Sequence, residues 1–568
     1  MGARRLRGII AIAVASIVAI ACAKQITLTG GAKDVKPPET KECTPANGST
    51  NFSEKHITVK FNEYIKLNDV ASKLIVSPPM DEKPTTVVSG KKLKITIDPS
   101  KLKPNTTYCL NFNDAVADIN EGNAMNSFVY AFSTGTEIDS LEFAGTIYDA
   151  YTRKPVNDAW VLLHSDFSDT AVATKIPDYI TKVDKNGNFR ISYVAEKDYK
   201  IFALRDNNSN FKFDLPEESI AFLDTVFHPS VETIVDTVPV KDSVNPDSVK
   251  IVKKYNRKPD DVKMLLFKEN KTPQFIGSSK RLRRNYFELV FNFRQYEKYN
   301  FSVPGDSSIY VWAKENPDTV FLWLKDTSII ASDTLKILAE YVDPAFPDSV
   351  HNDTLKFRKQ DKLFADTTLT MKLAKDKMPN ADYHISFSLP IESFDTAKIH
   401  LFSSVDTIFE PMQCFVDKDS VSPLKLNVIA DIVEGSSYKI VVDSAFATCI
   451  YGFVNDIDSV VFLPKRETDF GSLKILFSSD KTYLVELIQG EKVMASQISI
   501  DGSAQFVYLQ PGKYDIRVVE DSNGNGRWDT GDYSKNLQPE KVFYYPSGYD
   551  IRSSWEHEIT WEGDEGKY

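Results

Sequence analysis

The segment Tyr199-Lys-Ile-Phe-Ala-Leu-Arg-Asp206-Asn-Asn-Ser-Asn-Phe-Lys-Phe-Asp214 is echoed far along the chain by Tyr514-Asp-Ile-Arg-Val-Val-Glu-Asp521-Ser-Asn-Gly-Asn-Gly-Arg-Trp-Asp529. In both copies an apolar strand-like run leads into a loop rich in Asp and Asn, which predicts a β-strand followed by a tight turn. Internal similarity of this kind indicates a repeated structural unit. The chain has 568 residues, and at roughly 150 residues per domain it should contain about four domains.

The composition favours a globular β protein. Apolar residues make up 42% and charged residues 26% of the chain, which is ordinary for globular proteins. The chain contains 35 Phe and 25 Tyr but only 8 Met, and aromatic residues suit a half-buried pleated surface. The net charge of −11 offers no basic field for a phosphate backbone, so no nucleic-acid partner is expected.

Residues 41–136 alternate in short apolar segments such as Ile57–Phe61 and Leu93–Ile97, a pattern typical of a small antiparallel sandwich. The phrases Ser-Pro78-Pro79, Leu102-Lys-Pro104 and Phe132-Ser-Thr-Gly135 resemble the bacterial Ig-like domain found in surface-layer proteins and in Bacteroidetes lipoproteins. The resemblance implies a binding or spacer module without chemistry of its own.

Residues 137–225 follow another pattern. Gly145-Thr-Ile147-Tyr-Asp149 and the later Asp184-Lys-Asn-Gly187-Asn-Phe189 resemble the transthyretin-like, carboxypeptidase-regulatory-like sandwich. The repeated segment places a second unit of this type at residues 467–568. A looser echo of the Ig-like pattern, around Tyr383–Phe387 and Tyr438–Val441, predicts a second Ig-like domain at residues 371–466.

Two regions fit neither pattern. Residues 226–260 lack a regular turn rhythm and are expected to form a linker or a long edge excursion. Residues 261–370 resume strand patterning and are expected to form a β-sandwich of unassigned type. The fold class that we predict is therefore all-β, with tandem Ig-like and transthyretin-like β-sandwich domains in an extended array.

The N-terminus indicates export. Arg4, Arg5 and Arg7 precede an apolar run, Gly8–Ala21, which has the length of a signal peptide and is too short to span a bilayer. Residues 1–21 are therefore predicted to be a signal peptide. The alternatives are a plain secretory signal, in which Cys22 is incidental, and an uncleaved anchor.

The residues around Cys22 support a lipid anchor. Ala19-Ile-Ala-Cys22 resembles a relaxed lipobox, so Cys22 is the predicted lipid-attachment site, followed by a tether at residues 22–40. This predicts a lipid-anchored protein of the outer membrane of a Bacteroidetes-like bacterium. Lys24 and Gln25 stand where related surface-exported lipoproteins carry acidic residues, so the periplasmic and extracellular faces both stay open.

Four further cysteines could form disulfides in an exported chain. Spacing favours Cys43 with Cys109 and Cys414 with Cys449, although four cysteines allow three connectivities.

The clearest candidate site is a calcium-type loop. Oxygen donors stand at loop positions 1, 3, 5, 9 and 12, as in an EF-hand loop, with a glycine at position 6 and a carbonyl ligand at position 7. The predicted ligands are Asp521, Asn523, Asn525, Asp529, Asp532 and the carbonyl group of Arg527. A structural Ca²⁺ is the expected cofactor, and a solvated Asn/Gly hairpin is the alternative.

The first copy of the loop is a weaker candidate. Its donors are Asp206, Asn208, Asn210, Asp214 and Glu217. Phe211 occupies the glycine position, and a bulky residue resists the positive φ that the turn requires.

Catalytic motifs are not evident. The seven histidines are dispersed, and the sequence has no nucleophile elbow, phosphate loop or zinc-protease helix. We expect a non-enzymatic cell-envelope lipoprotein that acts as a structural or interaction subunit with an envelope protein partner, specifically as an accessory part of an outer-membrane assembly or secretion complex. The alternative is a glycan-binding surface lipoprotein, for which the sugar-stacking candidates are Tyr544, Tyr545, Tyr549, Trp555 and Trp561.

Overall fold

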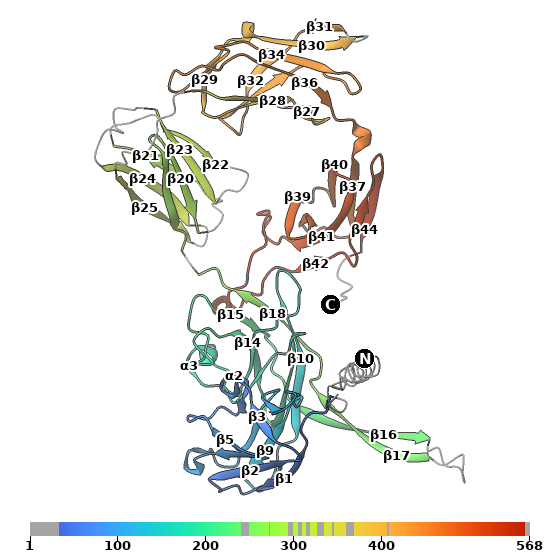
Figure 1. The fold of residues 1–568 in the computed structure, drawn as a ribbon. Helices are drawn as coiled ribbons and strands as arrows, with labels where there is room; N and C mark the ends of the chain where they lie inside the picture. Colours follow the sequence, from blue (N-terminus) through green and yellow to red (C-terminus); the bar gives the residue numbers. More distant parts are fainter. Residues whose placement is uncertain are drawn as a thin grey trace, which may run out of the picture.

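The computed structural model describes residues 33–239, 249–271, 273–292, 299–304, 309–313, 318–325, 334–343, 346–358, 368–405 and 408–562. The predicted signal peptide and Cys22 lie outside this part of the chain. Nearly all regular structure is β-strand (Figure 1). Within the described ranges, no helix has the length and apolarity needed to cross a membrane. Five successive β units follow one another, which we number unit 1 to unit 5.

Unit 1 (residues 40–133) is a sandwich with a four-stranded sheet, β1-β2-β6-β5, and a three-stranded sheet, β4-β7-β9, while β3 pairs with β8. Its elements are β1 (Thr40–Thr44), β2 (His56–Phe61), β3 (Ile65–Leu67), α2 (Val70–Lys73), β4 (Ile75–Ser77), β5 (Thr85–Ser89), β6 (Lys92–Thr96), η1 (Pro99–Lys101), β7 (Thr107–Asn111), β8 (Val116–Asp118) and β9 (Val129–Ser133). Alternate residues of β2 and β6, such as Val59 and Leu93, are fully buried between the sheets, as the period of a strand requires.

Unit 4 (residues 371–464) repeats this topology. Its strands β26-β28-β33-β32, β30-β34-β36 and β29-β35 match β1-β2-β6-β5, β4-β7-β9 and β3-β8, with β27 and β31 added at the edges of the second sheet. Its elements are β26 (Met371–Leu373), β27 (Asp376–Lys377), β28 (Tyr383–Phe387), β29 (Ile391–Phe394), η3 (Thr396–Lys398), β30 (Ile399–Val405), β31 (Ile408–Met412), β32 (Phe415–Lys418), β33 (Lys425–Ile429), β34 (Tyr438–Val442), β35 (Ala447–Cys449) and β36 (Asp458–Pro464). In both units a buried tyrosine closes the same corner: Lys103 N donates to Tyr108 Oη (2.8 Å) and Val433 N donates to Tyr438 Oη (2.9 Å).

Unit 2 (residues 141–268) has one seven-stranded sheet in the order β12-β11-β14-β15-β18-β10-β13. Its elements are β10 (Leu141–Asp149), β11 (Trp160–His164), α3 (Ala171–Thr174), β12 (Tyr179–Lys182), β13 (Asn188–Val194), β14 (Lys200–Arg205), β15 (Ser219–Phe222), β16 (Ser230–Pro239), β17 (Val249–Lys258) and β18 (Val262–Lys268). Residues 226–260, expected to be a linker or a long edge excursion, contain the β16–β17 hairpin. Residues 261–268 do not begin the next unit, because β18 pairs in parallel with β10.

Unit 5 (residues 471–561) has the strand pairing of unit 2. Its elements are β37 (Gly471–Phe477), β38 (Tyr483–Gln489), β39 (Lys492–Ile498), β40 (Ser503–Leu509), β41 (Gly512–Glu520), η5 (Tyr533–Lys535), β42 (Val542–Tyr544), β43 (Tyr549–Ile551) and β44 (Glu556–Trp561), preceded by η4 (Glu467–Asp469). Strands β37 to β42 pair as β10 to β15 do, and the last strand of each unit, β44 or β18, runs parallel to the first. Gly145 lies at the parallel contact of unit 2, where an added Cβ would meet the Val262 carbonyl oxygen at 2.0 Å. Gly471 lies just before the equivalent contact of unit 5, where an added Cβ would meet the Arg552 carbonyl oxygen at 2.4 Å.

Unit 3 (residues 276–358) is a sandwich of the sheets β19-β20-β23-β22 and β21-β24-β25. Its elements are β19 (Ile276–Arg283), β20 (Tyr286–Phe291), β21 (Tyr299–Ser302), β22 (Ile309–Ala313), β23 (Thr319–Leu324), β24 (Thr334–Asp343) and β25 (Phe346–Arg358). Phe321 and Trp323 face away from its own core and pack into the core of unit 4, so these two units share apolar contacts.

The array of units does not run on as a rod. After unit 4 the chain returns, and unit 5 lies beside unit 2 (Figure 1). Backbone and side-chain hydrogen bonds join the two, for example from Thr530 Oγ1 to the Lys268 carbonyl oxygen (2.6 Å) and from Gln538 Nε2 to the Phe222 carbonyl oxygen (3.0 Å). Units 2 to 5 therefore form a closed circuit.

Candidate functional site

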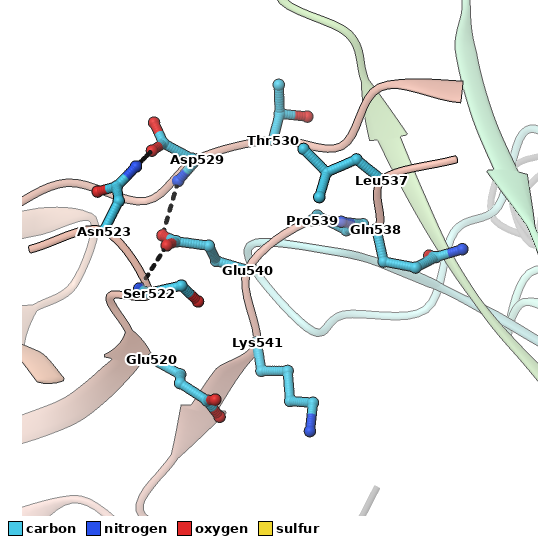
Figure 2. Close-up of a pocket in the computed structure, with 10 residues that line it drawn as sticks. All are labelled: Glu520, Ser522, Asn523, Asp529, Thr530, Leu537, Gln538, Pro539, Glu540 and Lys541. Atoms are coloured by element: carbon cyan, nitrogen blue, oxygen red, sulfur yellow. Dashed lines mark hydrogen bonds between the residues drawn. The ribbon is translucent and has the colours of Figure 1, made fainter. Parts of the chain in front are cut away.

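The repeated Asp/Asn loop of unit 5 connects β41 to β42 and lies at the junction with unit 2. A cavity of about 290 Å³ opens beside it (Figure 2). The residues that line this cavity are Glu520, Ser522, Asn523, Asp529, Thr530, Leu537, Gln538, Pro539, Glu540 and Lys541. Because the loop is both polar and part of an interface between units, it is the first candidate for a functional site.

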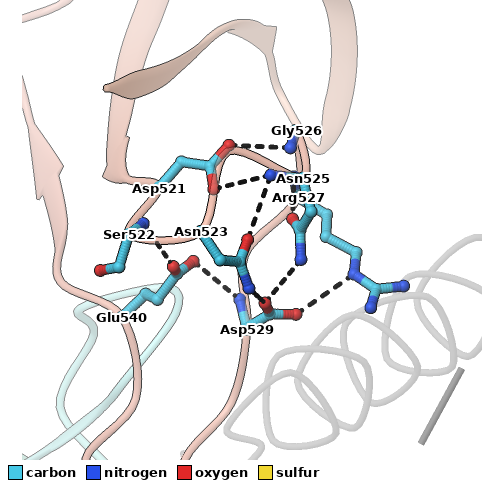
Figure 3. A network of polar contacts seen from close by, with 8 residues as sticks. All are labelled: Asp521, Ser522, Asn523, Asn525, Gly526, Arg527, Asp529 and Glu540. Atoms are coloured by element: carbon cyan, nitrogen blue, oxygen red, sulfur yellow. Dashed lines mark hydrogen bonds and ion pairs between the residues drawn. The ribbon is translucent and has the colours of Figure 1, made fainter. Parts of the chain in front are cut away.

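Four of the predicted calcium ligands belong to one hydrogen-bond network in this loop (Figure 3). Asp521, which is 2% exposed, accepts hydrogen bonds from the backbone of Asn525 (3.1 Å) and Gly526 (2.8 Å). The amide nitrogens of Asn523 and Asn525 each lie 2.6 Å from Asp529 Oδ2. Gly526 has a φ of 72°, the left-handed conformation that glycine adopts most easily.

Asp532, the fifth predicted side chain, does not join them. Its carboxylate caps η5 by accepting from Ser534 N (3.0 Å) and pairs with Lys535 (3.1 Å). Glu540 closes the loop instead, since it accepts from the backbone of Ser522 (2.7 Å) and Asp529 (3.0 Å). Burial and the negative charges of Asp529 and Asp521 raise the pKa of Glu540.

The loop of unit 2 between β14 and β15 has the same internal bonding. Asn208 and Asn210 donate to Asp214 at 3.0 and 2.7 Å, as their counterparts do to Asp529. Asp206 accepts from the backbone of Phe211 at 2.7 Å. Phe211 nevertheless has a φ of 60°, so the bulky residue adopts the conformation that we expected it to resist.

A glutamate also closes the loop of unit 2. Glu218, which is fully buried, accepts from Asn207 N (3.2 Å) and Asp214 N (3.0 Å). The predicted ligand Glu217 is exposed and does not take this position. Sequence reasoning missed Glu218 and Glu540 because both follow the twelfth and last position of an EF-hand loop. More residues separate Asp529 from Glu540 than Asp214 from Glu218, so a simple alignment of the two loops does not match the two glutamates.

The loop of unit 5 has donors of the kind that Ca²⁺ prefers, namely carboxylate, amide and carbonyl oxygens. The side-chain oxygens of Asn523 and Asn525 accept from the backbone of Asn525 (3.1 Å) and Arg527 (3.0 Å), while their amide nitrogens donate to Asp529. A cation at Asp529 would therefore have to displace these amide hydrogen bonds. No cluster of three or more His, Cys, Asp or Glu side chains suited to a metal occurs among the described residues, so a cation here would need amide and backbone oxygens in addition to the carboxylates of Asp521 and Asp529.

Tyr533 anchors the loop of unit 5 on unit 2. Its ring contacts Phe202, Phe213 and Phe222 edge-on, with centroids 5.8, 6.4 and 5.1 Å away. Its hydroxyl group donates to the Asp169 carbonyl oxygen (2.9 Å). Burial raises the pKa of Tyr533 to about 12, so the hydroxyl remains protonated and able to donate.

In a second contact between units 2 and 5, a tyrosine of unit 2 packs on side chains of unit 5. Tyr151 of unit 2 packs on Trp528 with centroids 5.0 Å apart, and the guanidinium group of Arg517 lies 4.1 Å from the Tyr151 ring centre. Arg517 Nε also donates to Glu486 Oε2 at 2.6 Å, and both side chains are nearly buried. The strand register places Leu162 and Phe202 of unit 2 at the positions of Glu486 and Arg517.

All four described cysteines are free thiols, so the predicted Cys43–Cys109 and Cys414–Cys449 bonds are not formed. Cys43 lies on β1 and Cys109 on β7, in opposite sheets of unit 1. Packed sheets are about 10 Å apart, whereas a disulfide needs Cα atoms within about 7 Å. Burial raises the pKa of Cys109 to about 12.

The histidines also remain apart. The closest ion-pair contacts are His228 with Asp198 (2.7 Å) and His400 with Asp443 (3.1 Å), both on exposed strands or loops. His164 is buried and its Nε2 has no hydrogen-bond partner in the described structure. These contacts do not converge on one another.

The C-terminal aromatic residues divide into two groups. Tyr545, Tyr549 and Trp561 pack against the core of unit 5, whereas Trp555 is 56% exposed. The guanidinium group of Arg552 lies 5.1 Å from the Trp555 ring centre.

Comparison with known proteins identifies one part of the chain. Residues 34–134 match the family model of the bacterial Ig-like domain, so unit 1 is a bacterial Ig-like domain, as the sequence phrases indicated. No curated protein matches the chain.

Two solved structures match the chain at low identity. The major pilin subunit of Bacillus cereus is 10% identical, with 74% of this chain and 99% of that chain covered and a TM-score of 0.16. The S-layer protein SbsC is 10% identical, with 91% and 68% covered and a TM-score of 0.14. These scores indicate no shared overall arrangement.

Proposed function

We propose that this protein is a non-enzymatic cell-envelope lipoprotein that acts as a structural or interaction subunit. In its specific form, it is anchored to the outer membrane through Cys22 and serves as an accessory part of an outer-membrane assembly or secretion complex. The closed circuit of units 2 to 5, which are joined by apolar contacts and hydrogen bonds, supports this proposal.

The observation that carries the proposal is the β16–β17 hairpin. Its strands pair from Ser230 with Lys258 to Pro239 with Val249 and extend away from the sheet of unit 2 (Figure 1). Val235 and Tyr255 on it are 60% and 59% exposed. An isolated two-stranded hairpin is only marginally stable in water, so a protein partner that covers these side chains would stabilise it.

Crosslinking of intact cells tests the proposal. Cells that carry the full chain are crosslinked mildly, extracted with detergent, and the proteins captured with the chain are identified by mass spectrometry. We expect one outer-membrane protein to be recovered reproducibly, and to be lost with the Val235→Asp and Tyr255→Asp variants. The matched control is Val87→Asp, at a residue that is 62% exposed on unit 1. Recovery of the chain alone in every case would contradict the interaction role.

We further propose that the loop of residues 521–532 binds a structural Ca²⁺ through Asp521, Asn523, Asn525, Asp529 and the Arg527 carbonyl group, with Glu540 holding the loop closed. Its place at the junction with unit 2 would link the cation to the closed arrangement of the units.

Glycan binding is the second candidate function. The exposed ring of Trp555 beside Arg552 favours it, because sugars stack on exposed aromatic faces. A glycan array probed with the full chain tests this function. Specific binding that is abolished by Trp555→Ala would support it.

A further inference from the structure

Strand β39 of unit 5 forms one edge of its sheet and pairs only with β38. Within the part of the chain that the structure describes, no backbone hydrogen bond joins residues 492–498 to any other element. One side of β39 lines a groove of about 1830 Å³ between units 2, 3 and 5. Such an edge presents backbone donors and acceptors that another strand can pair with.

The equivalent edge in unit 2 is covered. Its strand β12 lies against β4 of unit 1, and Ile180 N donates to Ser77 Oγ at 3.0 Å. A strand of the preceding Ig-like unit therefore covers the outer side of β12, and its Ser77 side chain accepts the outward N–H group of Ile180. Ile75 of β4 joins the apolar cluster that contains Ile180, so the contact is apolar as well as polar.

The internal repeat identifies the matching position in unit 5. Ile180 pairs with Leu162, and Ser496 pairs with Glu486, which is the counterpart of Leu162. Ser496 is thus the equivalent of Ile180, and it lines the groove. Unit 4, the Ig-like unit before unit 5, does not cover this edge, because its strands pack against unit 3 and not against β39.

The surroundings of β39 suit a protein strand. Val493 and Met494 are 38% and 45% exposed, and Phe275 across the groove is 47% exposed. Lys492 and Glu491 add charges of both signs, so the groove has no strong field that would favour a polyanion. A register shift leaves Met494 as a bulge, and the regular stretch that follows, Ala495–Ile498, contains Ser496.

We propose that β39 is a docking edge that receives an extended β-strand of a partner protein, centred on Ser496, at the position where β4 covers β12 within the chain. The strand pairs through backbone hydrogen bonds, as in β-strand addition, and places apolar side chains against Val493 and Met494. The inference rests on the proposed interaction role. It specifies that the partner is a protein with an exposed β-strand, and not a glycan or a lipid.

A photocrosslinking amino acid at position 496 of the full chain, expressed in its own cells, tests the docking edge. We expect a crosslink to a β-strand segment of another protein, mapped by mass spectrometry to the residue. The same probe at position 180 is the matched control and should yield only crosslinks to unit 1. Crosslinks from position 496 only to the same chain, to lipid or to glycan would overturn the proposal, as would the lack of any crosslink.

A third probe at position 255 separates this inference from the interaction role itself. Protein crosslinks from position 255 without any from position 496 would overturn the docking edge and leave the interaction role standing.

The mapped segment, made as a synthetic peptide, then provides an affinity test. Ser496→Pro removes an edge N–H group that no other element of the described structure uses, and we expect at least a tenfold loss of affinity. Ser496→Ala retains the N–H group and should bind as the native chain does. Equal binding by all three chains would overturn the proposal.

Discussion

Tyr533 of unit 5 lies edge-on to Phe222 of unit 2, with the ring centroids 5.1 Å apart. More than three hundred residues separate them along the chain, so this contact closes the circuit of units 2 to 5. The closure makes unit 5 part of a frame rather than the free end of a rod.

Tyr533→Ala should open this frame. The variant loses three ring contacts and the hydrogen bond to Asp169, at a cost of about 2–4 kcal/mol to the contact between the units, because a large, half-buried ring is removed. Tyr533→Phe is the control, since it loses only the hydroxyl group, worth about 1 kcal/mol. Small-angle X-ray scattering should show a larger radius of gyration for Tyr533→Ala than for Tyr533→Phe. Identical scattering would argue against the closure.

Gly531→Ala should displace the same loop by a different route. A Cβ at this position would lie 2.6 Å from the Leu537 carbonyl oxygen and 2.6 Å from the Phe267 ring of unit 2. Gly277→Ala is the control, because its nearest neighbour would be 3.6 Å away. Hydrogen exchange of β15 should accelerate in the first variant only. Unchanged exchange in both chains would show that the loop is not seated on unit 2.

The buried Glu486–Arg517 pair tests whether units 2 and 5 have equivalent positions, since Leu162 and Phe202 occupy these positions in unit 2. Burial lowers the pKa of Arg517, but hydrogen bonds and charge from Glu486 outweigh it and raise the pKa overall. Glu486→Gln leaves the guanidinium charge uncompensated and should destabilise the chain by about 3 kcal/mol.

The double variant Glu486→Leu/Arg517→Phe introduces the residues that unit 2 has at these positions. It should lie within about 1 kcal/mol of the native chain in denaturant unfolding, because an apolar pair of similar volume replaces the ion pair. If it is as unstable as Glu486→Gln, the two sites are not equivalent.

His164 should make unit 2 sensitive to acid. Burial, with a smaller contribution from Lys175, lowers its pKa from 6.5 to about 4, so protonation favours the unfolded chain. The stabilisation is present above pH 6.5 and is lost as the pH falls toward 4, by about 3 kcal/mol in total. His164→Ile, which introduces the residue found at the equivalent position 488, should flatten the loss between pH 6.5 and 4. An unchanged pH profile of unfolding would contradict this assignment.

Calcium should raise the thermal midpoint of the full chain if the loop of unit 5 binds it. Asp529→Ala removes the carboxylate at which both amides point and should abolish the rise. Asp214→Ala, the same change in the loop of unit 2, shows whether that loop contributes. A midpoint that calcium leaves unchanged in the native chain would rule out the calcium proposal.

Much of the architecture could be predicted from the sequence because strand periodicity and turn residues are local signals. Alternation in β2 and β6 predicted the sandwich of unit 1, and the repeated Asp/Asn segment predicted that units 2 and 5 are alike. The register of β14 and β41 shows the same relationship residue by residue.

The remainder depended on contacts between distant residues. Tyr533 follows a turn and resembles any loop tyrosine until Phe222 is placed beside it. Glu540 closes its loop from a position that no fixed spacing indicates. Val262 begins a strand that pairs with Gly145, and nothing local distinguishes it from the start of a new domain.

Zero-length carbodiimide crosslinking tests the closed arrangement most directly. Lys271 Nζ, next to unit 2, lies 4.0 Å from Asp532 Oδ1 of unit 5. The competing amine of Lys535 is removed by replacement with Arg, and the competing carboxylate of Glu269, 2.6 Å from Lys271 Nζ, by replacement with Gln. The account predicts an intramolecular Lys271–Asp532 crosslink in the monomer, alongside the internal control Lys481–Glu520, whose charged atoms are 2.8 Å apart. Formation of the control crosslink without the Lys271–Asp532 crosslink would contradict the closure of units 2 to 5.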